Sequence, residues 1–118
     1  MKTFIIALVV FSVLLTLIIL NALFVNRTMD ELRAAILILP ACDEIALVDI
    51  LTSWKNHYTL LSLSVSRNEM RDMDVWLAEM RIAATRGDTL QFETARAKAL
   101  DSIDDIRRLE RIALSNIL

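Results

Sequence analysis

The residues of this chain that are best suited to chemistry are Asp49, Ser53 and His57, the last being its single histidine. If the segment after Pro40 is helical, their spacing of four places a carboxylate, a hydroxyl and an imidazole in one row along the helix. Such a row suggests nucleophilic catalysis. However, the serine stands between the other two groups, and no glycine-rich turn supplies an oxyanion hole. We therefore expect His57 to lie on a helix surface, and we predict no catalytic residue.

Metal and cofactor sites are not indicated either. His57 is not part of a paired Glu-x-x-His pattern, and Cys42 is the single cysteine. One cysteine allows no internal disulfide and no multi-cysteine metal site, which leaves a disulfide between two copies as the alternative role. Asp72 and Asp74 lack the glycine and the regularly spaced oxygens of a calcium loop. The sequence therefore predicts a protein that is not an enzyme and has no metal and no cofactor.

The longest apolar segment, Phe4 to Val25, is the element to which the rest of the chain is attached. No charged residue and no histidine occurs from Thr3 to Asn26. A helix rises 1.5 Å per residue, so about 20 apolar residues cross the hydrocarbon core of a bilayer. A cleaved signal peptide, the alternative, has a shorter apolar region of about 7–15 residues that ends in small residues. We predict a retained transmembrane anchor at residues 1–26.

The charges beside the anchor give its orientation. Lys2 lies on a short tail at one end, while Arg27 and Arg33 follow the other end. A short tail is easily kept in the cytoplasm, and the rest of the chain then lies outside. The sequence predicts a single-pass protein of the cell membrane, with a cytoplasmic N-terminus and membrane lipid as one partner. Lipidation of Cys42 is not expected, because charged residues separate it from the apolar segment.

The remainder of the chain is predicted to be helical, because one glycine and one proline are too few for the turns of a β-rich fold. Thr28 and Glu31 have the form of a capping box that would begin a new helix. Alternatively, anchor and stalk form one continuous helix that ends before Pro40. Ser66 suits a helix N-terminus, and Gly87 suits a helix C-terminus.

Beyond Pro40, apolar residues at spacings of three and four predict three amphipathic helices, and short turns favour their antiparallel packing. We therefore predict an all-α protein with an anchor at 1–26, a helical stalk at 27–40 and an extracytoplasmic antiparallel three-helix bundle at 41–118. The predicted inner faces are Leu47, Leu51, Trp54, Tyr58, Leu61 and Val65 in the first helix; Met70, Met73, Leu77, Met80 and Ala84 in the second; and Phe92, Ala95, Ala99, Ile103, Ile106, Leu109, Ala113 and Ile117 in the third.

The composition also limits the partners. A net charge of −2 provides no basic surface for nucleic acid. We predict a protein-interaction or accessory module that binds another membrane or envelope protein and is able to form a homodimer; an extracytoplasmic ligand-sensing bundle is the alternative. The residues predicted to form the interaction surface are Ile36, Leu37, Leu39, Trp54 and Trp76.

Several segments resemble a bacterial family designated domain-of-unknown-function family 4363. They are the opening Met-Lys-Thr-Phe-Ile-Ile, the segment Trp54-Lys55-Asn56-His57 followed by Leu60-Leu61-Ser62, the segment Ser66-Arg67-Asn68-Glu69, and the ending Leu109 to Leu118. Members of this family are short proteins with an N-terminal membrane helix followed by a helical region. The resemblance covers nearly the whole chain, and it implies the same architecture here. It implies no activity and no site residue.

Overall fold

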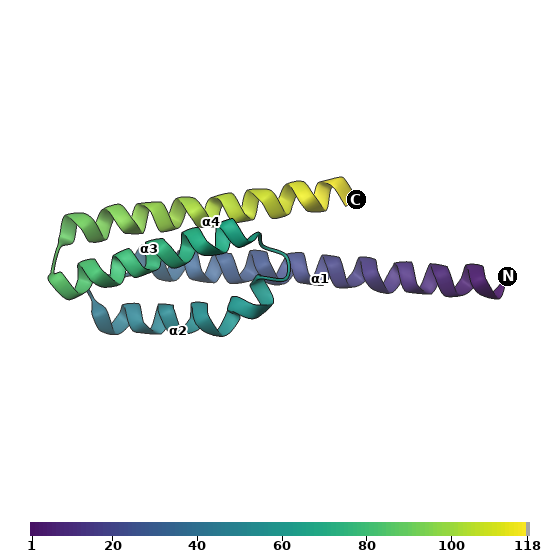
Figure 1. Ribbon diagram of the computed structural model, residues 1–118, viewed down its shortest axis with the longest axis horizontal. Coiled ribbons are helices and arrows are strands. Elements are labelled where there is room, and N and C mark those ends of the chain that lie inside the picture. Colours follow the sequence, from purple (N-terminus) through teal and green to yellow (C-terminus); the bar gives the residue numbers. More distant parts are fainter. Residues whose placement is uncertain (118) are drawn as a thin grey trace.

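The computed structural model describes residues 1–117, with the backbone alone for Leu114 and Ile117. These residues form four helices: α1 (Lys2–Ile38), α2 (Glu44–Leu61), α3 (Arg67–Arg86) and α4 (Thr89–Ile117). Figure 1 shows a long N-terminal helix whose second half lies among the other three helices. The predicted all-α class, a long apolar helix followed by a helical bundle, is confirmed.

Helix α1 is continuous over 37 residues, because no glycine or proline interrupts it before Pro40. The Thr28–Glu31 capping box therefore does not begin a new helix. In the apolar half, the hydroxyls of Ser12 and Thr16 donate to carbonyl oxygens of the preceding turn at 2.9 and 2.8 Å, so their polar groups are satisfied within the helix. By length and composition, α1 is the one helix in the described part of the chain that could cross a membrane.

The predicted stalk is part of the bundle. Along the second half of α1, Val25, Met29, Leu32 and Ile36 recur at spacings of three and four, and all of them are buried. This stripe packs between α2 and α4, and the helices form an antiparallel four-helix bundle in which each helix neighbours the next and α4 returns to α1. The stalk forms the fourth helix of this bundle because burying its apolar stripe removes hydrocarbon surface from water.

The core follows the predicted faces closely in α3 and α4. Met70, Met73, Leu77, Met80 and Ala84 are buried, as are Phe92, Ala95, Ala99, Ile103 and Ile106. Leu109, predicted to continue this face, is 45% exposed, Ala113 is exposed as well, and the side chain of Ile117 lies outside the described residues. Helix α2 differs at three positions, since Ile50 is buried while Leu51 and Tyr58 are only half-buried. Contacts are densest between α3 and α4 and sparsest where α2 meets α1 and α3.

Capping interactions mark the helix ends, and the predicted N-cap at Ser66 and C-cap at Gly87 are among them. The side chains of Asp43, Ser66 and Asp88 accept hydrogen bonds from backbone N–H groups three residues further on, at 3.0–3.3 Å. Helix α3 ends at Gly87, which has φ +66°. Cys42, in the connection from α1 to α2, also has a positive φ, of 60°.

Gly87→Ala tests whether α3 ends at a residue that must adopt the left-handed backbone conformation. A methyl group at this position would meet no other atom within 4 Å, so the cost is conformational: we expect a loss of about 1–2 kcal/mol in the free energy of unfolding. Urea unfolding of the full chain in detergent micelles, followed by tryptophan fluorescence, measures it. Ala97→Gly, at an exposed site inside α4, gives the ordinary cost of a helix-interior glycine for comparison. An unchanged urea midpoint for Gly87→Ala would contradict the left-handed conformation of Gly87.

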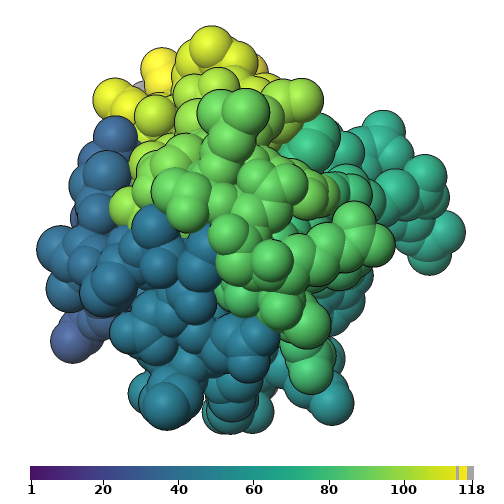
Figure 2. Space-filling model, turned by 90° about the vertical axis from the view of Figure 1, so that its left-hand side faces the viewer, coloured from purple at the N-terminus to yellow at the C-terminus, as the bar shows by residue number. Residues whose placement is uncertain are grey.

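Polar side chains join α4 to α1 along their contact. Arg107 pairs with Asp30 at 2.8 Å, and Arg33 pairs with Asp104 at 3.2 Å. Near the end of α1, the guanidinium of Arg96 donates to the carbonyl oxygen of Leu39. Figure 2 views this distal end of the bundle, where the α1–α2 connection (blue) lies beside the turn between α3 and α4 (green). The interaction places a positive charge at the C-terminus of α1, where the helix dipole favours it.

Candidate functional site

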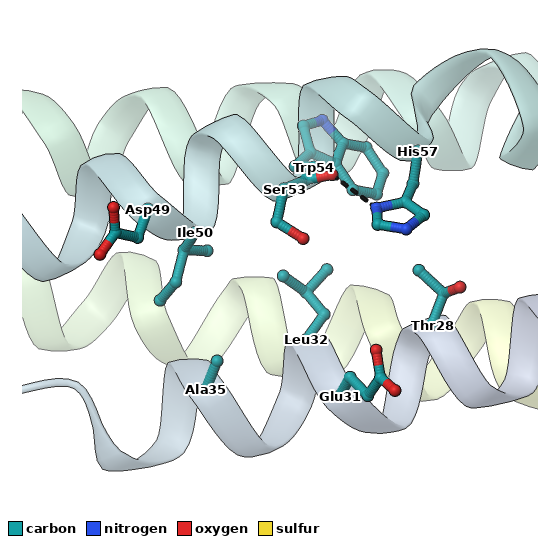
Figure 3. A pocket seen from close by; sticks show the side chains of 9 residues that line it. All are labelled: Thr28, Glu31, Leu32, Ala35, Asp49, Ile50, Ser53, Trp54 and His57. Carbon is teal, nitrogen blue, oxygen red and sulfur yellow. Dashed lines mark hydrogen bonds between the residues drawn. The ribbon is translucent and has the colours of Figure 1, made fainter.

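A groove of about 200 Å³ lies between α1 and α2, where these two helices are least closely packed. Figure 3 shows that side chains from both helices point into it. The residues that line it are Thr28, Glu31, Leu32 and Ala35 from α1 and Asp49, Ile50, Ser53, Trp54 and His57 from α2. The groove therefore exists only because the stalk residues are part of the bundle.

The groove has an apolar floor and a polar rim. Leu32, Ile50 and Trp54 are buried and form the floor with half-buried Ala35. Carboxylates of Glu31 and Asp49 stand on opposite walls, one from each helix. Glu31 keeps an exposed ion pair with Arg27 at 3.3 Å, a type of contact that contributes little stability and is readily exchanged. An apolar anchor flanked by a positive charge would complement this surface.

Contacts with Asp74 and Tyr58 fix the position of Trp54 in the floor of the groove. Its indole N–H donates to a carboxylate oxygen of Asp74 on α3 at 2.7 Å, and its ring meets that of Tyr58 edge-on with centroids 5.8 Å apart. The negative charge of Asp74 raises the pKa of the Tyr58 phenol, with desolvation and a hydrogen bond to Asp74 acting in the same direction. The contacts of Trp54 and Tyr58 with Asp74 join α2 to α3, and they leave the opposite face of α2 free to form the groove.

Asp74→Asn is expected to lower the pKa of Tyr58 toward its ordinary value of 10.0, because the amide retains an acceptor for Trp54 but carries no charge. Tyr58 is the single tyrosine, so tyrosinate absorbance gives its titration directly. The pKa of Tyr58 is higher in the folded state than in the unfolded state. The neutral phenol therefore contributes to the stability of the fold below pH 10.0, and this contribution is lost as the pH rises through the folded-state pKa. Asp72→Asn is the control; an equal shift there would contradict a local effect.

His57 does not form a charge-relay pair with Asp49. Its Nδ1 lies 2.7 Å from the carbonyl oxygen of Ser53, and a carbonyl can only accept, so Nδ1 carries the proton. The Ser53 hydroxyl points into the groove, whereas the Asp49 carboxylate lies on α2 at the opposite end from His57 (Figure 3). The imidazole also lies against the ring of Phe24, with centroids 5.9 Å apart. His57 therefore closes the end of the groove that is nearer to the N-terminal half of α1.

The predicted interaction residues are distributed differently from the expectation. Ile36, Leu39 and Trp54 are buried within the chain itself, whereas Leu37 is 46% exposed. Trp76 is half-buried, and the ammonium of Lys98 lies 4.6 Å from the centroid of its ring. Of the five residues, Trp54 alone lines the groove.

Sequence reasoning missed the α1 wall of the groove. Thr28 and Glu31 have the pattern of a helix cap, which hid their position on a continuous helix. The signal that was available is the apolar stripe from Val25 to Ile36, which at a helical spacing requires a covering partner.

Comparison with known proteins adds no relative. No family model matches the chain, and no curated protein and no solved structure matches it, so membership of family 4363 stays a prediction from the residues quoted above.

Proposed function

We propose that this chain is a single-pass membrane protein whose bundle binds another membrane or envelope protein through the α1–α2 groove and performs no catalysis. The observation that carries the proposal is the groove itself, with its apolar floor and two carboxylates at its rim. The groove begins two residues beyond the charge-free segment of α1, at Thr28. A partner that reaches it must therefore lie close to the membrane surface.

The shape and charge of the groove specify the partner's chemistry. An elongated slot between two helices accommodates a third helix that inserts apolar side chains at helical spacing. Glu31 and Asp49 favour a lysine or arginine beside those anchors. The expected partner is thus an amphipathic helix with a basic residue flanking its apolar face. A second copy of this chain is the alternative occupant.

Ligand sensing is the second candidate function, and the size of the groove argues against it. Small-molecule pockets commonly enclose about 300–1,000 Å³, whereas this groove has about 200 Å³. That volume suits an inserted side chain better than a whole ligand. Catalysis is disfavoured by the contact of His57 with a backbone carbonyl rather than with the Ser53 hydroxyl.

Site-specific photocrosslinking in cells tests the interaction. A benzophenone amino acid at Ser53, on the rim of the groove, is expected to give one discrete protein adduct, whereas the same probe at exposed Thr94 on α4 should not. Ala35→Phe fills the groove and should abolish the adduct, while Ala97→Phe, on an exposed face, should preserve it. Asp49→Lys should weaken it by repelling the basic residue.

Three results would decide against the proposal or redirect it. Equal adducts from Ser53 and Thr94, or an adduct that survives Ala35→Phe, would show that the groove is not the docking site. An adduct of twice the chain's mass of 13.4 kDa would identify a second copy as the occupant. Absence of any protein adduct, with a ligand-dependent rise in melting temperature, would favour the sensor.

In the proposed topology the bundle lies outside the cytoplasm, and the positive charge of Lys2, at the N-terminal end of the span, lies on the cytoplasmic side. A single cysteine at Leu90, 79% exposed at the distal turn, in a Cys42→Ser background tests this. Labelling by an impermeant maleimide in intact cells is the expected result. Labelling only after the membrane is opened would place the bundle in the cytoplasm.

A further inference from the structure

The free part of α1 is too short to cross a bilayer without bringing part of the bundle into contact with lipid. Elements of the bundle reach α1 at Ile18, which lines a cavity together with Ala22, Leu63, Glu110 and Ala113. Between the charge at Lys2 and this first contact lie residues 3–17, about 22 Å of helix. The hydrocarbon core is about 30 Å thick, so roughly 8 Å of it must surround α1 where other elements already flank the helix.

The elements at this level expose apolar side chains. Leu60 and Leu63, at the end of α2 and in the α2–α3 connection, are 52% and 74% exposed, and Leu109 and Ile112 on α4 are 45% and 51% exposed. Figure 1 shows that α4 ends beside the middle of α1 and that the α2–α3 connection lies near the same level. These four residues form the membrane-proximal apolar rim.

We propose that the membrane-proximal apolar rim is immersed in the boundary between headgroups and acyl chains of the bilayer that α1 crosses. This inference rests on the membrane anchoring proposed above. Immersion completes the missing span, and it removes the rim's hydrocarbon from water. It also explains why the apolar face of α4 continues to Leu109 although, among the side chains that the structure describes, Ile106 is the last buried one on this helix.

Arg111 and Ser62, two polar residues of this region, are compatible with the headgroup layer. Arg111 is exposed beside Ile112, and a long arginine side chain can lie along apolar surface while its guanidinium reaches phosphate. The Ser62 hydroxyl donates to the carbonyl oxygen of Thr59 at 2.7 Å, so it enters the interface already hydrogen-bonded. The α2–α3 connection thus carries a leucine at its tip and no charge from Tyr58 to Val65.

Depth-dependent quenching tests the immersion. The full chain in a Cys42→Ser background receives one cysteine at Leu63 or at Leu90, which are comparably exposed leucines at opposite ends of the bundle. A third cysteine at Leu14, on the free part of α1, reports the anchor. Each is labelled with NBD and reconstituted in phosphatidylcholine nanodiscs with or without brominated acyl chains. We expect loss of emission in the brominated lipid for Leu14 and Leu63 and unchanged emission for Leu90.

Each other outcome has a definite meaning. Quenching at Leu14 without quenching at Leu63 would overturn the immersion while leaving the anchor intact, and it would show that the bilayer thins to meet α1. Equal quenching at Leu63 and Leu90 would show a bundle lying flat on the membrane and would also overturn the inference. Absence of quenching at Leu14 would remove the anchoring itself. Unchanged far-ultraviolet circular dichroism of each labelled protein confirms that folding is preserved.

Discussion

Replacing Phe92 with alanine is expected to lower the free energy of unfolding by about 3–5 kcal/mol, a large part of what a small domain possesses. Phe92 is fully buried in the first turn of α4 and is the largest of the fully buried side chains. Its removal takes away an aromatic ring and leaves a cavity between α4 and its neighbours. Urea unfolding of the full chain in detergent micelles, followed by tryptophan fluorescence, measures the loss.

Leu90→Ala is the matched control for Phe92→Ala. Leu90 lies in the same turn of α4 but is 79% exposed, so its truncation should change the free energy of unfolding by less than about 0.5 kcal/mol. Similar losses for the two variants would mean that the start of α4 does not pack as described.

Arg96→Met is expected to cost about 1.5–3 kcal/mol, the usual range for a hydrogen bond from a charged donor. The guanidinium donates to the Leu39 carbonyl oxygen, and its carbon atom lies 5.0 Å from the centroid of the Phe92 ring. Methionine preserves the length and apolar contact of the side chain but has no donor. The carbonyl of Leu39, a residue only 4% exposed, then loses the partner that Arg96 supplies. The same urea titration measures the effect.

Two further variants separate the hydrogen bond from charge alone. Arg108→Met removes an arginine that is 67% exposed and pairs with Asp105 at 2.7 Å; exposed pairs are worth about 0–1 kcal/mol. Arg96→Lys retains one charged donor and should recover part of the stability. A loss for Arg108→Met as large as for Arg96→Met, or no recovery with lysine, would rule out the proposed role of the bond to Leu39.

Local pattern accounts for most of the helical architecture. Met70, Met73 and Met80 are buried because a helix brings residues three and four apart to one face, and this rule needs no tertiary information. Gly87 ends α3 because it tolerates a positive φ without a steric cost. The same reasoning placed Leu51 on the inner face of α2 where Ile50 is buried, since adjacent positions differ by about 100° and a small rotation of the helix exchanges them.

The partner of each face could not be predicted from the sequence. The apolar stripe that contains Met29 and Ile36 indicates that this face of α1 packs against another helix. Periodicity does not tell which helix that is. The groove depends on α2 remaining apart from α1 while Trp54 bonds to Asp74, an arrangement set by contacts between residues distant in sequence. For the same reason Glu31, which has the form of a capping-box residue in the sequence, becomes part of the candidate site.

The continuity of α1 also has a mechanical meaning. A helix of 37 residues without glycine or proline offers no hinge, so the bundle cannot swing independently of the N-terminal half of α1. With α1 crossing a bilayer as proposed, tilt of this half, which follows bilayer thickness, would be transmitted as an equal tilt of the groove. A change in membrane thickness would thus change the angle at which the groove faces the proposed partner protein.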